Sequence, residues 1–205
     1  IFRRYVPPEY IAGHPDIEKY FVVEEMPSEF WEYVYSTEAL AELHGSKLAK
    51  KKNLISQFMR KYENIEVKKI DANILPECLT LSEHWRGSHL NDERVEQEKQ
   101  ALACAVQNYT ELGIDGLAIF ADGAMKAFSM FSRINKESCT VHFEKAEPDA
   151  KGAAQMINHE TAKYLLGKFK YINREQDLGI EGLRHAKMSY MPEYMLKNCL
   201  LTRKT

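Results

Sequence analysis

Apolar residues recur along the chain with two spacings, one typical of helices and one typical of strands. The helical spacing predicts helices over 73–84, from Asn91 or Asp92 to Gly113, over 153–167 and over 180–188. Short runs rich in β-branched and aromatic residues predict strands over 20–25, 65–70, 139–146, 171–173 and 198–203. Asp122-Gly123 separates two apolar runs within 116–131 and predicts a β-hairpin there.

The first third of the chain is less regular. Prolines at 7, 8, 15 and 27 break residues 1–35, in which 20–25 is the one clear strand. Residues 36–62 are predicted to be helical, with Ser36 as the N-cap and Gly45 as a break.

From residue 65 the predicted order is strand, two helices, three strands, helix, strand, helix, strand. An antiparallel meander that runs into a strand–helix–strand crossover is typical of the GNAT-type acyltransferase fold. The expected class is therefore α/β (α+β), with a mixed twisted sheet flanked by helices.

Composition limits the partners. The 205 residues carry 28 Lys and Arg against 30 Asp and Glu, so the overall charge favours no polyanionic partner. Four widely spaced cysteines without a CxxC pair fit reduced thiols in a cytosolic protein, and none of the seven histidines has a metal-ligand spacing. We therefore expect no metal, no transmembrane segment and a cytoplasmic location. Because the chain begins with Ile1, an N-terminal part is expected to be missing.

The segment 145–158 is a candidate anion site. In a GNAT fold the loop before this helix binds a pyrophosphate through backbone N–H groups and small residues. The cofactor-binding candidates are Lys151, Gly152, Ala153 and Ala154. Asp149 stands where the acyl-CoA signature has Gln or Arg, and an ordinary loop-to-helix transition is the alternative.

Strand 139–146 supplies a second candidate. Strict alternation would place Thr140, His142 and Glu144 on one face, with His142 and Glu144 as a catalytic pair. The alternative is a polar sheet face in contact with solvent.

The strongest candidate is the segment 172–190, which carries six fully charged side chains. Burying such a cluster is costly unless its members are paired, so convergence would indicate a charged ligand. The six are Arg174, Glu175, Asp177, Glu181, Arg184 and Lys187. An exposed, salt-bridged helix is the alternative.

Basic residues in 46–53 form a fourth feature. Lys47 and Lys50–Lys52 suit contacts with phosphates of RNA or lipid, and a solvated connector is the alternative.

Three separated segments, 36–58, 142–158 and 171–190, together resemble the C-terminal domain of bacterial phosphatidylglycerol lysyltransferases and its soluble stand-alone relatives. The resemblance runs from about Tyr20 to the end. It implies a tandem pair of GNAT-like lobes: the end of a first lobe in 1–35, a helical connector in 36–62 and a complete second lobe in 63–205.

The resemblance also implies aminoacyl transfer. Arg174, Glu175, Asp177, Glu181, Arg184 and Lys187 would line the cleft for a charged donor. Asp177 or Glu181 would hold the ammonium group of the donor, and Arg184 would orient a carboxylate or a developing oxyanion. His142 or Glu144 would take the proton of the acceptor.

Two functions follow as hypotheses. The first is a soluble acyl- or aminoacyltransferase that uses aminoacyl-tRNA or acyl-CoA and a lipid, peptide or amine acceptor. The second is a non-catalytic GNAT-like module that senses an amino acid or a phosphorylated metabolite.

Overall fold

The computed structural model describes residues 2–86 and 93–204, with side chains from 5 to 83 and from 96 to 204. The chain divides into two compact units. One unit consists of 37–172, and the other combines 1–36 with 173–205. The assignment of 1–35, 36–62 and 63–205 to two GNAT-like lobes and a connector stays a prediction.

Unit 37–172 is built on an antiparallel meander. The strands of the meander are β4 (Ile65–Lys69), β5 (Asp115–Ala121), β6 (Ala124–Arg133) and β7 (Ser138–Ala146), adjacent in this order. Strand β8 (Tyr171–Asn173) lies next to β7 in the same sheet. The predicted hairpin is confirmed, because β5 pairs antiparallel with β6 around Asp122 and Gly123. Both turn residues have positive φ, 50° and 79°, as a two-residue hairpin of this kind requires.

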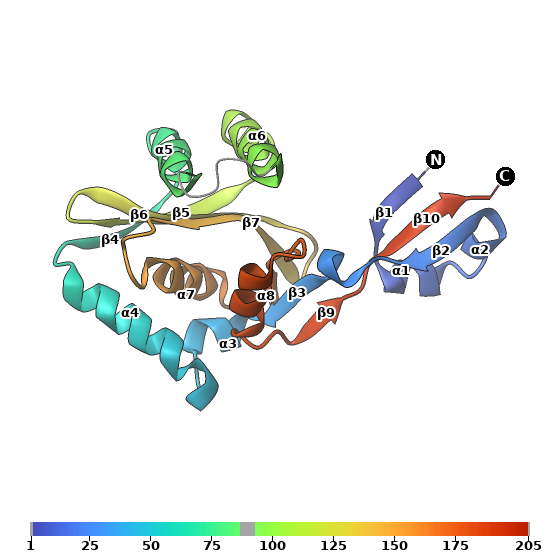
Figure 1. Cartoon of the computed structure of the whole chain (residues 1–205), viewed down its shortest axis with the longest axis horizontal. Coiled ribbons are helices and arrows are strands. Elements are labelled where there is room, and N and C mark those ends of the chain that lie inside the picture. Colours follow the sequence, from blue (N-terminus) through green and yellow to red (C-terminus); the bar gives the residue numbers. More distant parts are fainter. Residues whose placement is uncertain (1, 87–92, 205) are drawn as a thin grey trace. The chain divides into compact units, whose positions relative to one another are not determined.

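Helices cover both faces of this meander (Figure 1). The helices of the unit are α3 (Thr37–Glu42), η2 (Ser46–Leu48), α4 (Ala49–Lys61), α5 (Leu75–Arg86), α6 (Glu93–Gln107) and α7 (Ala153–Leu165). Helices α5 and α6 lie on one face and α7 lies on the other. Gly45, at φ 87°, separates α3 from the pair η2 and α4, which confirms the predicted break.

The main apolar core lies between the sheet and helices α5 and α6. The helices contribute Cys78, Leu81, Leu102 and Ala105, and the strands contribute Ala118, Phe120, Phe128, Met130 and Phe143. Phe128 is fully buried, and removing such a side chain from water is worth about 1.5–3 kcal/mol. This packing fixes which face of β7 looks toward α6.

The helix before β5 is shorter than predicted. It was expected to stop at Gly113, but α6 ends at Gln107. The next side chain, Asn108, donates from Nδ2 to the carbonyl oxygen of Cys104 at 2.9 Å and so competes with continuation of the helix. The expected starting residues Asn91 and Asp92 lie outside the described residues.

The second unit combines the two ends of the chain. It contains β1 (Phe2–Val6), α1 (Pro8–Gly13), α2 (Ile17–Tyr20), β2 (Phe21–Glu25), η1 (Ser28–Phe30), β3 (Glu32–Ser36), α8 (Glu181–Met188), β9 (Tyr194–Leu196) and β10 (Cys199–Arg203). Strand β10 lies between β1 and β2, antiparallel to both, and β3 pairs antiparallel with β9. The predicted irregular structure over 1–35 is therefore wrong for β1, α1, α2 and β3.

Candidate functional site

Strand β3 and the loop before α8 form the polar centre of the terminal unit. The backbone N–H of Arg174 donates to the carbonyl of Tyr33 at 2.9 Å, and the N–H of Tyr33 donates to the carbonyl of Glu175 at 3.2 Å. The N–H of Leu178 donates to the carbonyl of Glu29 at 3.0 Å. The loop is thereby held along β3, although the two segments are far apart in the sequence.

Asp177 is a central acceptor of the hydrogen bonds in this loop. Its carboxylate is fully buried and accepts four hydrogen bonds. Arg184 donates from Nε to Oδ2 at 2.7 Å and from Nη2 to Oδ1 at 3.1 Å. The Tyr33 hydroxyl donates to Oδ2 at 2.5 Å, and the N–H of Gly179 donates to Oδ1 at 2.8 Å. Four bonds use the full acceptor capacity of a carboxylate.

These contacts set the ionisation of the group. Burial alone would raise the pKa of Asp177, but the hydrogen bonds from Arg184, Tyr33 and Gly179 and the Arg184 charge hold that pKa below its usual value. Burial and the hydrogen bond to the carboxylate raise the pKa of Tyr33 to about 12. The bond to Asp177 raises the pKa of Arg184 further, so the guanidinium is a fixed cation.

Lys187 and Arg174 also contact protein groups at this loop. Lys187 is 7% exposed, and its Nζ donates to the carbonyl oxygens of Arg174 at 2.6 Å and Gln176 at 2.5 Å. The guanidinium of Arg174 lies over the rings of Tyr35 at 5.7 Å and Tyr190 at 5.0 Å. Both cations therefore order protein groups.

Glu32 of β3 joins the loop to the C-terminal segment. Its carboxylate accepts from the side-chain amides of Asn173 at 2.5 Å, Gln176 at 3.0 Å and Asn198 at 2.9 Å. The Asn173 side chain in turn accepts from the N–H of Glu175 at 2.8 Å. This network links residues that no local pattern connects.

The loop backbone is strained. Glu175 and Leu178 have φ of 56° and 53°, a region that non-glycine residues rarely adopt, and Gly179 follows at 74°. Such conformations persist where surrounding contacts over-determine them and are concentrated at functional sites. Here the surrounding contacts are the bonds of Asp177, Lys187 and Glu32.

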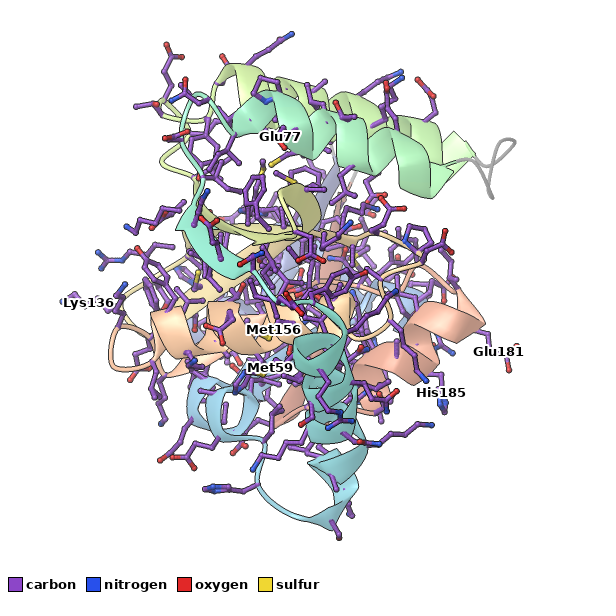
Figure 2. All side chains as sticks on the ribbon, turned by 90° about the vertical axis from the view of Figure 1, so that its left-hand side faces the viewer. Met59, Glu77, Lys136, Met156, Glu181 and His185 are labelled. Atoms are coloured by element: carbon purple, nitrogen blue, oxygen red, sulfur yellow. The ribbon has the colours of Figure 1, made fainter. Side chains whose placement is uncertain are left out.

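Other charges of the predicted cluster point elsewhere. Glu181 and His185 project from α8 into the surroundings, away from the helix (Figure 2). Their side chains are exposed, whereas Glu175 is half-buried. The structure thus brings Asp177 together with Arg184, and Lys187 with the main chain of Arg174, but leaves Glu181 outside that network.

In unit 37–172, the candidate anion loop leads into α7. Gly152 stands at the N-cap with φ 91°, where a Cβ atom would lie 2.2 Å from the carbonyl oxygen of Leu54 on α4. The close approach that requires glycine is therefore made by the protein itself. Gly152 and Ala153 are buried there, and Lys151 and Ala154 are exposed.

The predicted alternation of β7 is wrong. Thr140 pairs with Ser132 and Glu144 pairs with Ser129, and these partners are three residues apart on β6, on opposite faces. The cause is a β-bulge with His142 as the extra residue between Val141 and Phe143. Thr140 and Glu144 consequently do not share a face.

The two candidates on β7 have different neighbours. His142 Nε2 lies 2.8 Å from Ser132 Oγ. Glu144 Oε2 accepts from Asn158 Nδ2 of α7 at 3.3 Å. Lys145, on the other face from Glu144, reaches Glu98 of α6 at 2.6 Å. Their catalytic roles stay predictions.

The basic segment begins at η2. Lys47 belongs to η2, Lys50–Lys52 lie in the first turn of α4, and the described side chains of Lys47, Lys50 and Lys52 are exposed. RNA or lipid binding at this segment stays a prediction.

Within residues 2–86 and 93–204, no three His, Cys, Asp or Glu side chains lie close enough together to hold a metal ion. None of the helices described there is long and apolar enough to cross a bilayer.

Sequence reasoning missed Tyr33, Glu32 and Tyr35. Tyr33 lies 144 positions from Asp177, and neither the spacing nor the composition of residues 32–36 signals that contact. The signal that was available, a dense set of charges beside Gly179, located only one side of the site.

The chain belongs to the class of proteins with the GNAT-like fold, which is mixed α/β with flanking helices. A tandem GNAT protein from the clavulanic acid biosynthesis pathway matches 98% of this chain, over 62% of its own length, with TM-score 0.50 and 6% identity. A C-terminal domain of a putative lysylphosphatidylglycerol synthetase from Agrobacterium fabrum matches the whole chain, over 68% of its own length, with TM-score 0.68 and 14% identity.

The family is shown by the sequence. Residues 26–200 match the family "Phosphatidylglycerol lysyltransferase, C-terminal", and the chain belongs to it. The predicted resemblance is confirmed.

Two further relatives are similar over nearly the whole chain. A conserved protein of unknown function from Bacteroides thetaiotaomicron is 34% identical, with TM-score 0.91 over 99% of this chain and 69% of its own. An uncharacterized protein of Mycoplasmoides gallisepticum is 23% identical over 94% of this chain, which spans 61% of that relative's length.

Proposed function

We propose that this protein is an aminoacyltransferase that moves an aminoacyl group from aminoacyl-tRNA to a lipid, peptide or amine acceptor. The observation that carries the proposal is the Arg184–Asp177 pair, a guanidinium held from inside by a fully buried carboxylate, in a chain of the phosphatidylglycerol lysyltransferase C-terminal family.

Arg184 is the residue we assign to the reaction. Its Nε and one N–H of Nη2 bond Asp177, while 45% of its side chain is exposed. A guanidinium has five N–H donors, so the outer edge retains donors for an anionic oxygen. A pre-oriented cation of this kind stabilises the oxyanion that develops when an ester carbonyl is attacked.

Asp177 and Tyr33 are positioning residues in this mechanism. The carboxylate has no acceptor position left for a substrate ammonium, and it fixes the plane of the guanidinium through two bonds. Lys187 keeps the loop in its strained shape through the carbonyls of Arg174 and Gln176.

Aminoacyl-tRNA is preferred to acyl-CoA as donor. The conformation and close contact of Gly152 are explained by packing against the main chain of α4, and Asp149 is unfavourable near a pyrophosphate. Attack on an aminoacyl ester needs positioning more than an extreme nucleophile.

Calorimetric titration of the whole chain tests the donor. A non-hydrolysable lysyl-tRNA analogue is compared with uncharged tRNA and with acetyl-CoA. We expect saturable binding of the lysyl-tRNA analogue, weaker binding of uncharged tRNA and no saturable binding of acetyl-CoA. Binding of acetyl-CoA alone would identify an acyltransferase, and binding of none would favour the non-catalytic sensing module.

A further inference from the structure

Two turns of unit 37–172 each expose an aliphatic side chain. One is formed by residues 133–137 between β6 and β7, and the other by residues 163–170 at the end of α7. In these paired turns the side chain of Ile134 is 53% exposed and that of Leu166 is 46% exposed. Large apolar side chains on adjoining turns mark a candidate interaction surface.

Contacts hold the paired turns side by side. The backbone N–H groups of Lys170 and Tyr171 both donate to the carbonyl oxygen of Glu137, at 2.8 Å and 3.0 Å. The ring centroids of Phe131 on β6 and Tyr164 on α7 lie 5.8 Å apart. The ends of β6 and α7 therefore meet here, although the whole of β7 separates them in the sequence.

Other groups build the two turns. In the first turn, Asn135 Oδ1 accepts from the backbone N–H groups of Glu137 at 2.8 Å and Ser138 at 2.9 Å. An Asn side chain commonly stabilises a turn in this way. In the second turn, Leu165 takes the core position at 1% exposure, and its neighbour Leu166 remains at the surface. The exposed aliphatic side chains are therefore accessible to an external contact.

The paired turns are also rich in basic residues, with five Lys and Arg against one Glu. Two further acids contact them. Glu160 pairs with Lys163 at 2.9 Å. Asp115 accepts from the Tyr164 hydroxyl at 2.7 Å and is itself 3.7 Å from the Nζ of Lys69. The surface of the paired turns thus keeps an excess of positive charge. Its basic members are Arg133, Lys136, Lys163, Lys168 and Lys170.

This combination favours an anionic lipid surface as the partner. Aliphatic side chains gain free energy at the boundary between headgroups and acyl chains, and neighbouring lysines are attracted to anionic lipids. An RNA strand would use exposed aromatic rings for stacking, but Tyr164 and Phe169 are half-buried, and the Nζ of Lys168 lies 3.3 Å from the Tyr164 ring centroid. The core of a protein interface is depleted of lysine.

We propose that the paired turns dock this chain onto an anionic lipid surface. Ile134 and Leu166 enter the headgroup region, and Lys136, which extends away from the protein (Figure 2), contacts lipid phosphates. The inference goes beyond the proposed function and does not rest on it, because docking requires neither a donor nor transfer. It concerns unit 37–172 alone.

Cosedimentation of the full chain with vesicles tests the docking. One set of vesicles contains phosphatidylcholine alone, and the other contains phosphatidylcholine mixed with phosphatidylglycerol. We expect binding to the mixed vesicles to be about tenfold tighter or more, and to weaken at high salt, because salt screens exposed charges. Equal binding to both sets, or binding to neither, would overturn the proposal.

An apolar variant locates the contact. Ile134→Ser combined with Leu166→Ser is expected to weaken binding to the mixed vesicles about tenfold or more, since neither side chain can then insert. Leu112→Ser is the control, because Leu112 is 55% exposed and lies outside the paired turns. The melting temperatures should change little, since the substituted side chains are exposed. Unchanged vesicle binding by the double variant would refute the docking surface.

A charge variant tests the electrostatic part. Lys136→Glu is expected to weaken binding to the mixed vesicles about tenfold or more, because each lysine near an anionic surface contributes about fivefold. Lys52→Glu, at an exposed lysine of α4, changes the net charge by the same amount. An equal loss in Lys52→Glu would show attraction by the overall charge and refute the paired turns as the contact.

Further outcomes separate this inference from its rivals. Binding to polyuridylate without binding to vesicles would make the partner RNA and overturn lipid docking. Vesicle binding by a chain that transfers no aminoacyl group would refute only the proposed function. Aminoacyl transfer to a soluble amine without vesicle binding would refute only the docking.

Discussion

The guanidinium of Arg184 donates two hydrogen bonds to the carboxylate of Asp177, from Nε to Oδ2 at 2.7 Å and from Nη2 to Oδ1 at 3.1 Å. The side chain of Asp177 is fully buried, and the side chain of Arg184 is 45% exposed. The pair therefore converts a flexible surface arginine into a guanidinium of fixed orientation. A fixed cation costs little reorganisation when charge develops on a substrate.

Substitution of Arg184 tests this role. Arg184→Ala and Arg184→Lys are both expected to lower kcat for aminoacyl transfer, by about 10²–10³ for the alanine variant. Lysine keeps the positive charge but cannot make the two parallel hydrogen bonds of a guanidinium. The Arg184→Lys variant should therefore be little more active than the alanine variant. Steady-state kinetics and thermal unfolding are measured together, and the alanine variant should also unfold at a lower temperature because Asp177 is left without its cation.

His185→Ala is the control for these variants. His185 lies on the same helix, is exposed and points away from it (Figure 2). It should leave kcat and thermal unfolding unchanged. If Arg184→Lys equals the unchanged protein in kcat, the geometry of the fork is irrelevant to turnover.

Acid should weaken the fold through Asp177. Its pKa lies below the ordinary value of 3.8, so its ionised form contributes stability that is complete above that value. The contribution is lost as the pH falls through the lower pKa of the folded state. Denaturant unfolding between pH 6 and pH 2.5 should show the gap between the unchanged chain and Asp177→Asn shrinking below about pH 4. A gap that stays constant over that range would contradict the assignment.

Gly152 should not tolerate a side chain. Gly152→Ala places Cβ 2.2 Å from the Leu54 carbonyl oxygen at φ 91°, and should cost about 2 kcal/mol or more of unfolding free energy. Gly167→Ala isolates the backbone term, because Gly167 also has positive φ, 77°, with nothing within 4 Å of its Cβ. Urea unfolding measures the loss of unfolding free energy in both variants. Equal losses would show that α4 shifts to make room for the added methyl group.

Lys187 should matter for stability more than an exposed lysine. Lys187→Met leaves two carbonyl oxygens without their cation, and we expect a loss of about 2 kcal/mol or more. Lys136→Met is the comparison, since Lys136 extends away from the protein (Figure 2). Chemical unfolding of both variants decides the matter, and a loss no larger than that of Lys136→Met would mean that the loop is held by its other bonds.

Much of the fold was predictable because its elements carry local signals. Asp122-Gly123 marks the hairpin, Gly45 marks the break before α4, and the order of elements after residue 65 gave the GNAT-like class. Strands β3 and β9 were missed for the opposite reason. They have five and three residues, and β3 is buried at three successive positions, so no alternation is visible.

The site was predictable only in part. Charge density located Asp177 and Arg184, which do meet. The partner Tyr33 was invisible, because a contact across 144 positions leaves no periodicity. On β7, one extra residue at His142 reversed the expected faces, since period-2 reasoning assumes an unbroken ladder.

The most direct measurement is transfer itself. The full chain is incubated with radiolabelled lysyl-tRNA and, in parallel, alanyl-tRNA, with vesicles containing phosphatidylglycerol or with a primary amine. We expect labelled product that requires both protein and acceptor, and that falls with Arg184→Ala but not with His185→Ala. Labelled tRNA that stays charged, or is hydrolysed equally without acceptor, would contradict it.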